Sequence, residues 1–132
     1  MRQAVLDDLV AHASQEAPRE CCGILVGSTS RIERSFRARN LLKSATRYVM
    51  DPEDQFAAIR FAREAGLAVV GFYHSHPASD PVPSETDRRE AEYPNHWYLI
   101  VRPAAGERAA EVRGFLLEES GNFLPIALVP TP

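Results

Sequence analysis

Residues 67–77 read LAVVGFYHSHP, an apolar run that ends in two histidines separated by one residue. A continuous apolar run of this length, between a glycine and a proline, is typical of a strand buried on both faces of a sheet. Side chains alternate between the two faces of a strand, so His74 and His76 point to the same side. Two imidazoles at one strand end can bind a single metal ion.

The segment after these histidines supplies more polar groups. Three prolines between residues 77 and 83 exclude regular structure and predict a stiff loop. Ser84 is a strong N-cap candidate for a helix, and Asp87 then lies in the first turn of that helix. Zinc in catalytic sites typically takes three protein ligands and leaves its fourth position to water. Asp87 is the natural third ligand beside His74 and His76.

Two alternatives remain open when the residues are considered alone. The sequence from Ser84 to Asp87, SETD, also resembles a capping box, in which both side chains only satisfy backbone N–H groups. Composition also does not separate Asp87 from the other acids nearby, which are Asp80, Glu85, Glu90 and Glu92.

The rest of the chain predicts a mixed α/β domain of the α+β kind, with a central mixed sheet and about three helices. Helices are expected over Arg2–Glu16, from Asp51-Pro52 to Gly66, and from Ser84, and the second carries Phe56, Ile59 and Phe61. Six or seven strands are expected over Cys21–Val26, Ile32–Ala38, Arg47–Met50, Leu67–Tyr73, Trp97–Val101, Val112–Leu117 and Phe123–Val129. Pro125 confines the last strand to an edge or to an irregular section.

Length and charge narrow the functional classes. A chain of 132 residues with 45% hydrophobic residues predicts one domain over residues 1–132 with a core of its own. A formal net charge of −3 argues against nucleic acid as the main partner. The amino-terminal segment lacks the long apolar core that a signal peptide or a membrane span needs. We therefore expect a cytoplasmic protein. The adjacent Cys21 and Cys22 are expected to be reduced, buried thiols.

Several polar residues fall outside the metal-binding pattern. His12 and His96 are expected to be surface or packing histidines, and Asp80 is expected to lie solvated at the rim. Ser75 points away from its two neighbours, which favours a structural role.

Taken together, the motif His74-Ser75-His76-Pro77, then Ser84 and Asp87, closely resembles the JAMM, or MPN-plus, metalloprotease family. Members also carry a glutamate before a glycine-containing apolar strand, and Glu20 ahead of Cys21–Gly27 matches it. The resemblance spans nearly the whole chain and implies a single MPN-type, cytidine-deaminase-like domain. It resolves the choice of acid in favour of Asp87.

The resemblance implies specific roles for these residues. His74, His76 and Asp87 would bind one zinc ion per chain, whose bound water has a lowered pKa. Glu20 would be the general base, and Ser84 would donate a hydrogen bond to the oxyanion.

The resemblance also implies a substrate. The chain is similar to the small prokaryotic members, which points to a ubiquitin-like, β-grasp sulfur-carrier protein with a Gly-Gly tail, or to such a carrier bearing cysteine. The expected reaction is hydrolysis after that tail. Two alternatives are a non-catalytic MPN scaffold module and a peptidase acting on cell-wall or phage-tail peptides.

Overall fold

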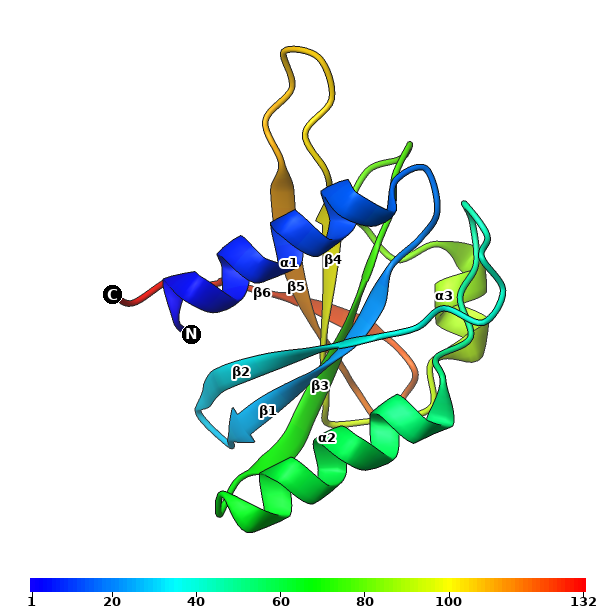
Figure 1. Ribbon diagram of the computed structural model, residues 1–132. Helices are drawn as coiled ribbons and strands as arrows, with labels where there is room; N and C mark the ends of the chain where they lie inside the picture. Colours follow the sequence, from blue (N-terminus) through cyan, green and yellow to red (C-terminus); the bar gives the residue numbers. More distant parts are fainter.

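The computed structural model describes residues 1–132 as a single six-stranded sheet with three helices (Figure 1). The strand order is β2-β1-β3-β4-β5-β6, and only the β3–β4 pair is parallel. The mixed α/β architecture predicted from the sequence is therefore confirmed. The elements are α1 (Gln3–Glu16), β1 (Cys22–Ser28), β2 (Arg31–Ala38), α2 (Pro52–Glu64), β3 (Ala68–Ser75), α3 (Glu85–Glu90), β4 (Trp97–Arg102), β5 (Glu111–Leu117) and β6 (Phe123–Ile126).

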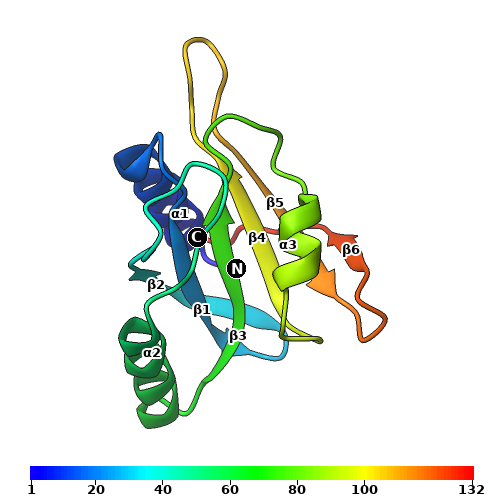
Figure 2. The same ribbon diagram turned by 90° about the vertical axis from the view of Figure 1, so that its right-hand side faces the viewer.

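Two apolar clusters form the core, one on each face of the sheet. On one face, α1 packs Val5, Leu9 and Ala13 against residues such as Tyr73 and Leu99. On the other face, α2 packs Ala58 and Ala62 against a second set, which comprises Cys22, Ile24, Val26, Phe72, Tyr98 and Leu117 among others. Figure 2 shows α3 in front of the sheet, and the Arg88 guanidinium of α3 lies over the Phe123 ring of β6, 6.0 Å from its centroid. Strand alternation places His74 on the α2 face, the same face as Phe72.

The second helix starts where the sequence predicted. The Asp51 side chain accepts a hydrogen bond from the Glu53 N–H (3.0 Å), and Pro52 occupies the first helical position. The buried positions of α2 are Ala58 and Ala62. Of the larger residues expected on this helix, Phe61 packs partly buried against the same cluster, and Phe56 is 65% exposed. Small residues face the sheet because α2 lies close to β1 and β3, and the larger Phe56 is left at the surface.

The strand predicted over Arg47–Met50 is wrong. Residues 41–50 form an irregular loop with one isolated bridge, between Asn40 and Met50. Its backbone N–H groups are partly satisfied by the Asn40 side chain, so the loop needs no neighbouring strand. The last strand is also shorter than predicted. It ends at Ile126 and forms the edge of the sheet, as Pro125 requires.

The two ends of the chain lie side by side at one corner of the sheet (Figure 1). The Thr131 N–H donates to the carbonyl of Met1 (2.8 Å), and the amino-terminal group donates to that of Val129 (3.0 Å). No helix has the length and apolar character needed to cross a bilayer.

Candidate metal centre

The carboxyl end of β3 places two imidazoles on one face of the sheet. His74 lies within the strand, and His76 follows it, with its N–H donating to the Val101 carbonyl of β4 (2.8 Å). This bond continues the sheet beyond the end of β3 and holds the HSHP segment in extended geometry. Both histidines are buried, at 2% and 5% exposure.

The first turn of α3 supplies the carboxylate. Ser84 caps the helix by accepting a hydrogen bond from the Asp87 N–H (3.0 Å), and Asp87 Oδ2 accepts one from the Ser84 N–H (2.9 Å). The capping box anticipated as a competing interpretation is thus present. It coexists with a metal-binding arrangement, because the same Oδ2 also faces both histidines.

Three ligand atoms form a nearly equilateral triangle. His74 Nε2 and His76 Nε2 are 3.2 Å apart, and Asp87 Oδ2 lies 3.1 Å and 3.0 Å from them. Two ligands bound tetrahedrally at about 2.0 Å from one ion would be about 3.3 Å apart. The triangle is therefore close to one face of a zinc coordination tetrahedron, and this donor set is compatible with zinc.

The tautomer of His76 also suits a metal ligand. Its Nδ1 lies 2.8 Å from the Asp80 carbonyl, which only accepts hydrogen bonds, so Nδ1 carries the proton. In the neutral ring, the lone pair of Nε2 then points into the triangle. A second hydrogen bond that fixes the tautomer in this way is typical of metal-bound histidines.

The charges within the triangle explain its pKa shifts. Burial alone would raise the pKa of Asp87, but hydrogen bonds with His74 and His76 hold it well below its usual range. Burial alone would lower the pKa of His76, but its bonds to Asp87 and to the Asp80 carbonyl raise it. The Asp87 carboxylate is thus ionised. Either a proton on an imidazole or a bound cation can balance its negative charge.

Glu20 is held across from His76 at the end of the β1–β3 pair. Cys22 pairs with His74 in the antiparallel register, and the Ser75 N–H donates to the Cys21 carbonyl (3.1 Å). Continuing this register puts Glu20 opposite His76 on the same face. Glu20 is separate from the three-residue cluster, which contains only His74, His76 and Asp87.

The carboxyl group of Glu20 is buried without a protein partner. Glu20 is 4% exposed, and its Oε1 makes no hydrogen bond. Burial raises the pKa of Glu20 to about 8, an effect that the His76 charge opposes and the Asp87 charge reinforces. A buried carboxyl oxygen without a hydrogen-bond partner, close to a candidate metal site, makes Glu20 a candidate catalytic residue.

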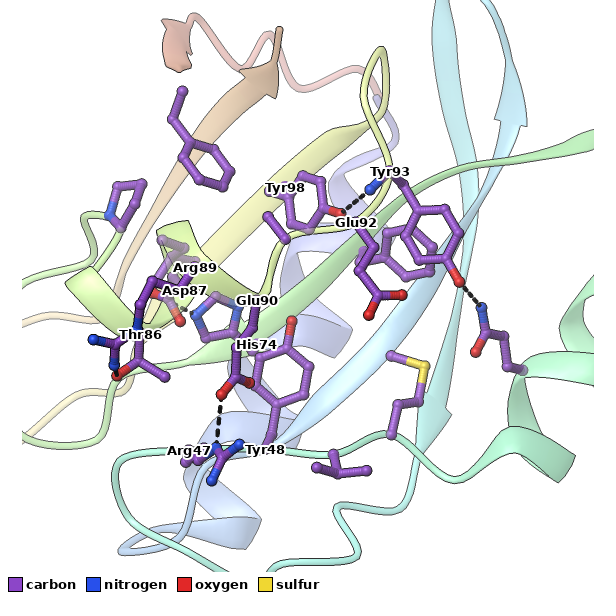
Figure 3. A pocket seen from close by; sticks show the side chains of 18 residues that line it. Arg47, Tyr48, His74, Thr86, Asp87, Arg89, Glu90, Glu92, Tyr93 and Tyr98 are labelled. Carbon is purple, nitrogen blue, oxygen red and sulfur yellow. Dashed lines mark hydrogen bonds and ion pairs between the residues drawn. The ribbon is translucent and has the colours of Figure 1, made fainter. Parts of the chain in front are cut away.

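A cavity of about 510 Å³ opens beside the triad, on the side of His74 and Asp87 (Figure 3). Its walls carry five aromatic rings, from Tyr48, Phe72, Tyr93, Tyr98 and Phe123. The Tyr48 ring stacks on His74 with centroids 4.8 Å apart. Tyr48 was not predicted as a site residue, because the composition of residues 47–50 is that of a strand. The only signal for Tyr48 in the sequence is that an aromatic residue stands shortly before the Asp51-Pro52 helix start.

The side chains of His12, Asp80 and Ser75 have the ordinary roles expected of them. His12 is buried against Tyr73, with Nδ1 2.7 Å from the tyrosine hydroxyl, and Asp80 is largely exposed near Arg102 and Arg108. The Ser75 hydroxyl accepts a hydrogen bond from the Cys21 N–H (2.8 Å), which is a structural role. Both cysteines are buried free thiols, and burial raises their pKa values, that of Cys21 to about 11.

A model of the family described as prokaryotic homologs of the JAB domain matches residues 2–113. The chain belongs to this family. The resemblance to the JAMM/MPN family drawn from the motif is thereby confirmed. A solution structure of protein DSY2949 from Desulfitobacterium hafniense has the same fold, with a TM-score of 0.85 and 31% identity, and the match covers 98% of this chain and 90% of that one.

The chain is also similar to proteins whose names record a function or an assembly. A desampylase of Haloferax volcanii is 39% identical over 117 residues, which cover 82% of this chain and 83% of that protein. A CysO-cysteine peptidase of Mycobacterium tuberculosis is 35% identical over 103 residues, or 76% of this chain and 70% of that protein. Tail tip assembly protein K of Escherichia phage N15 is 39% identical over 118 residues, or 88% of this chain but 46% of that protein.

Proposed function

We propose that this protein is a zinc metallopeptidase that hydrolyses the bond after the C-terminal Gly-Gly of a ubiquitin-like sulfur-carrier protein. Residues 1–132 would form one JAMM domain. The observation that carries the proposal is the triangle of His74 Nε2, His76 Nε2 and Asp87 Oδ2, with edges of 3.0 to 3.2 Å. The relatives named desampylase and CysO-cysteine peptidase support the class of substrate.

In this proposal His74, His76 and Asp87 hold the ion. Bound zinc would lower the pKa of a coordinated water from about 15.7 towards about 7 and polarise the scissile carbonyl. The protein's contribution is to keep the three donor atoms converged and buried, with Asp80 fixing the His76 ring through its backbone carbonyl.

Glu20 would act as the general base and then as the general acid. A carboxyl with a pKa of about 8 is protonated at neutral pH, but a cation held by the triad would lower the pKa of Glu20 by charge attraction. The ionised carboxylate would take a proton from water and pass it to the leaving amine. Its orphaned Oε1 leaves an acceptor free for this role.

Ser84 would stabilise the negative charge that develops on the scissile carbonyl oxygen. The Ser84 hydroxyl oxygen accepts from the Asp87 N–H, so its own proton is free to donate. Loss of one such donor typically lowers the rate by about 10² to 10³. The Ser84→Ala variant is therefore expected to lower kcat by that factor while retaining zinc.

A cleavage assay tests the proposed function. The protein, loaded with zinc, is incubated with a β-grasp carrier extended beyond Gly-Gly, and products are followed by mass. Cleavage after the second glycine is expected for the wild type. A chelator and the Glu20→Gln substitution should each abolish turnover, and the Glu20→Gln variant should still bind zinc. An intact carrier after incubation with fully metallated wild type would refute the proposal.

A second candidate is a peptidase acting on cell-wall or phage-tail peptides, favoured by the similarity to the phage N15 tail tip assembly protein. The same catalytic groups would serve. Assaying peptidoglycan stem peptides beside the carrier separates the two candidates, because only the preferred substrate class should be cut. A non-catalytic scaffold role would instead be indicated by protein that contains no zinc when purified without chelators.

A further inference from the structure

Asn40, which is outside the catalytic motif, makes four hydrogen bonds through its side chain. Its Nδ2 donates to the carbonyls of Glu20 and Arg47 (both 3.1 Å), and its Oδ1 accepts from the N–H groups of Leu42 and Val49 (both 3.0 Å). Two carbonyl partners and two N–H partners fix the orientation of the amide. This side chain thus uses its full donor capacity within the protein.

These bonds attach Glu20 to the loop of residues 41–50. Glu20 lies two residues before the start of β1, where regular strand pairing no longer holds its backbone. Its N–H donates to the Ser44 carbonyl (2.7 Å), and its carbonyl accepts from Asn40. Both polar groups of the Glu20 backbone are therefore bound by the segment that Asn40 organises.

The same loop also contacts the candidate metal centre. Tyr48 stacks on His74, and the Arg47 guanidinium pairs with Glu90 of α3 (2.8 Å), as Figure 3 shows. Asn40 thus joins the backbone that carries the buried carboxyl to the loop that packs on a metal-ligand candidate.

We propose that Asn40 is a positioning residue, whose side-chain amide sets the position of the Glu20 carboxylate relative to the triad. The inference rests on the proposed function, because it assigns Glu20 a proton-transfer role. Misplacing a reacting group by about 1 Å can lower a rate by about 100-fold. The Asn40 side chain makes no hydrogen bond to His74, His76 or Asp87, so zinc affinity should change much less than kcat when Asn40 is replaced.

Two substitutions separate the hydrogen bonds donated by the Asn40 Nδ2 from those accepted by its Oδ1. Asn40→Asp keeps an acceptor for Leu42 and Val49 but loses both donated bonds. Asn40→Ala loses all four. The control is Thr46→Ala in the same loop, because the exposed Thr46 hydroxyl contacts only the Ser44 hydroxyl, at 3.5 Å.

Three measurements are made on each zinc-loaded variant: kcat and KM across pH, zinc affinity by competition with a chelator, and amide hydrogen exchange. For Asn40→Asp, kcat on the pH plateau should fall by at least about tenfold, with KM and zinc affinity within about threefold of wild type. Use of the plateau removes the effect of the added charge on the Glu20 pKa. The Glu20 N–H should exchange at least about tenfold faster, while those of Leu42 and Val49 stay protected. Thr46→Ala should match wild type.

Other outcomes overturn the inference. Asn40→Asp with wild-type kcat would show that the bond to Glu20 does not matter. A fall in kcat matched by an equal fall in zinc affinity would indicate a general structural role. Active wild type and inactive Glu20→Gln in the same assay establish the proposed function independently. If wild type is inactive, the proposed function fails. Hydrogen exchange at the Glu20 N–H in Asn40→Ala then decides whether Asn40 holds the Glu20 backbone in place, and an exchange rate equal to that of wild type overturns the inference.

Discussion

Glu20 is a single buried carboxyl whose protonation should make the stability of the metal-free protein depend on pH. Its pKa of about 8 in the folded chain exceeds the value of about 4.3 expected when unfolded, so the folded state binds the proton more tightly. The resulting stabilisation is complete below about pH 4 and is lost as the pH rises through about 8.

In the presence of a chelator, the stability of wild type relative to Glu20→Gln should therefore decrease between about pH 5 and pH 8. The slope is at most about 1.4 kcal/mol per pH unit, because one proton is involved. Urea unfolding of both proteins at several pH values measures this difference. Comparison with Glu20→Gln cancels the contributions of groups that titrate in both, Asp87 among them. Parallel stability curves would show that Glu20 does not titrate in this range.

At the scale of the elements, β1 depends on a glycine for its contact with β3. A Cβ atom built at Gly23 would lie 2.1 Å from Tyr73 Cε1 and 2.5 Å from the Phe36 carbonyl oxygen. The Tyr73 ring fills this space, and its hydroxyl reaches His12 of α1. The missing side chain at Gly23 therefore lets Tyr73 connect the sheet with α1.

The Gly23→Ala variant should consequently lose about 2–3 kcal/mol of unfolding free energy, since the buried ring and backbone must move. Gly66→Ala is the control, because Gly66 has a φ of +72° and no atom within 4 Å of a built Cβ. That change should cost only about 1 kcal/mol of backbone strain. Thermal denaturation compares the two, and an equal or smaller loss at Gly23 would contradict the packing argument.

For the whole molecule, the candidate metal centre joins the sheet to a helix that has little other support. None of the α3 residues is buried, whereas Asp87 of α3 meets His74 and His76 of the sheet. A ligand that binds only the folded state adds RT ln(1 + [L]/Kd) to its stability. Zinc at 100 times its Kd should therefore stabilise the protein by about 2.7 kcal/mol.

Thermal denaturation with zinc and with a chelator measures this effect, and hydrogen exchange should show lost protection in residues 85–90 after chelation. The matched variant is Asp87→Asn, which keeps the helix and weakens the site, and its melting temperature should respond much less to zinc. A wild-type melting temperature unaffected by zinc would mean that the triad does not bind the ion.

The amino-acid sequence by itself predicted the three helices and six strands that the structure has, because these depend on local patterns. The choice of Asp87 over the nearby acids came instead from the resemblance to the JAMM family. The strand period aligned His74 with His76, the proline-rich loop and Ser84 started a helix, and Asp51-Pro52 started another. Each of these signals acts within a few residues, where side-chain spacing and backbone capping fix the outcome.

Only the tertiary structure decided how distant segments meet. The β1–β3 register, continued two residues beyond the Cys22–His74 pair, puts Glu20 opposite His76, and residues 41–50 are closed by the side chain of Asn40 rather than by a strand. The segment 47–50 has strand-like composition, but the Arg47 carbonyl and the Val49 N–H bond to the Asn40 side chain, and the Val49 carbonyl accepts from the Leu41 N–H within the same loop. Burial of Glu20, the stacking of Tyr48 on His74 and the exposure of Phe56 follow from packing between elements, and no local period encodes them.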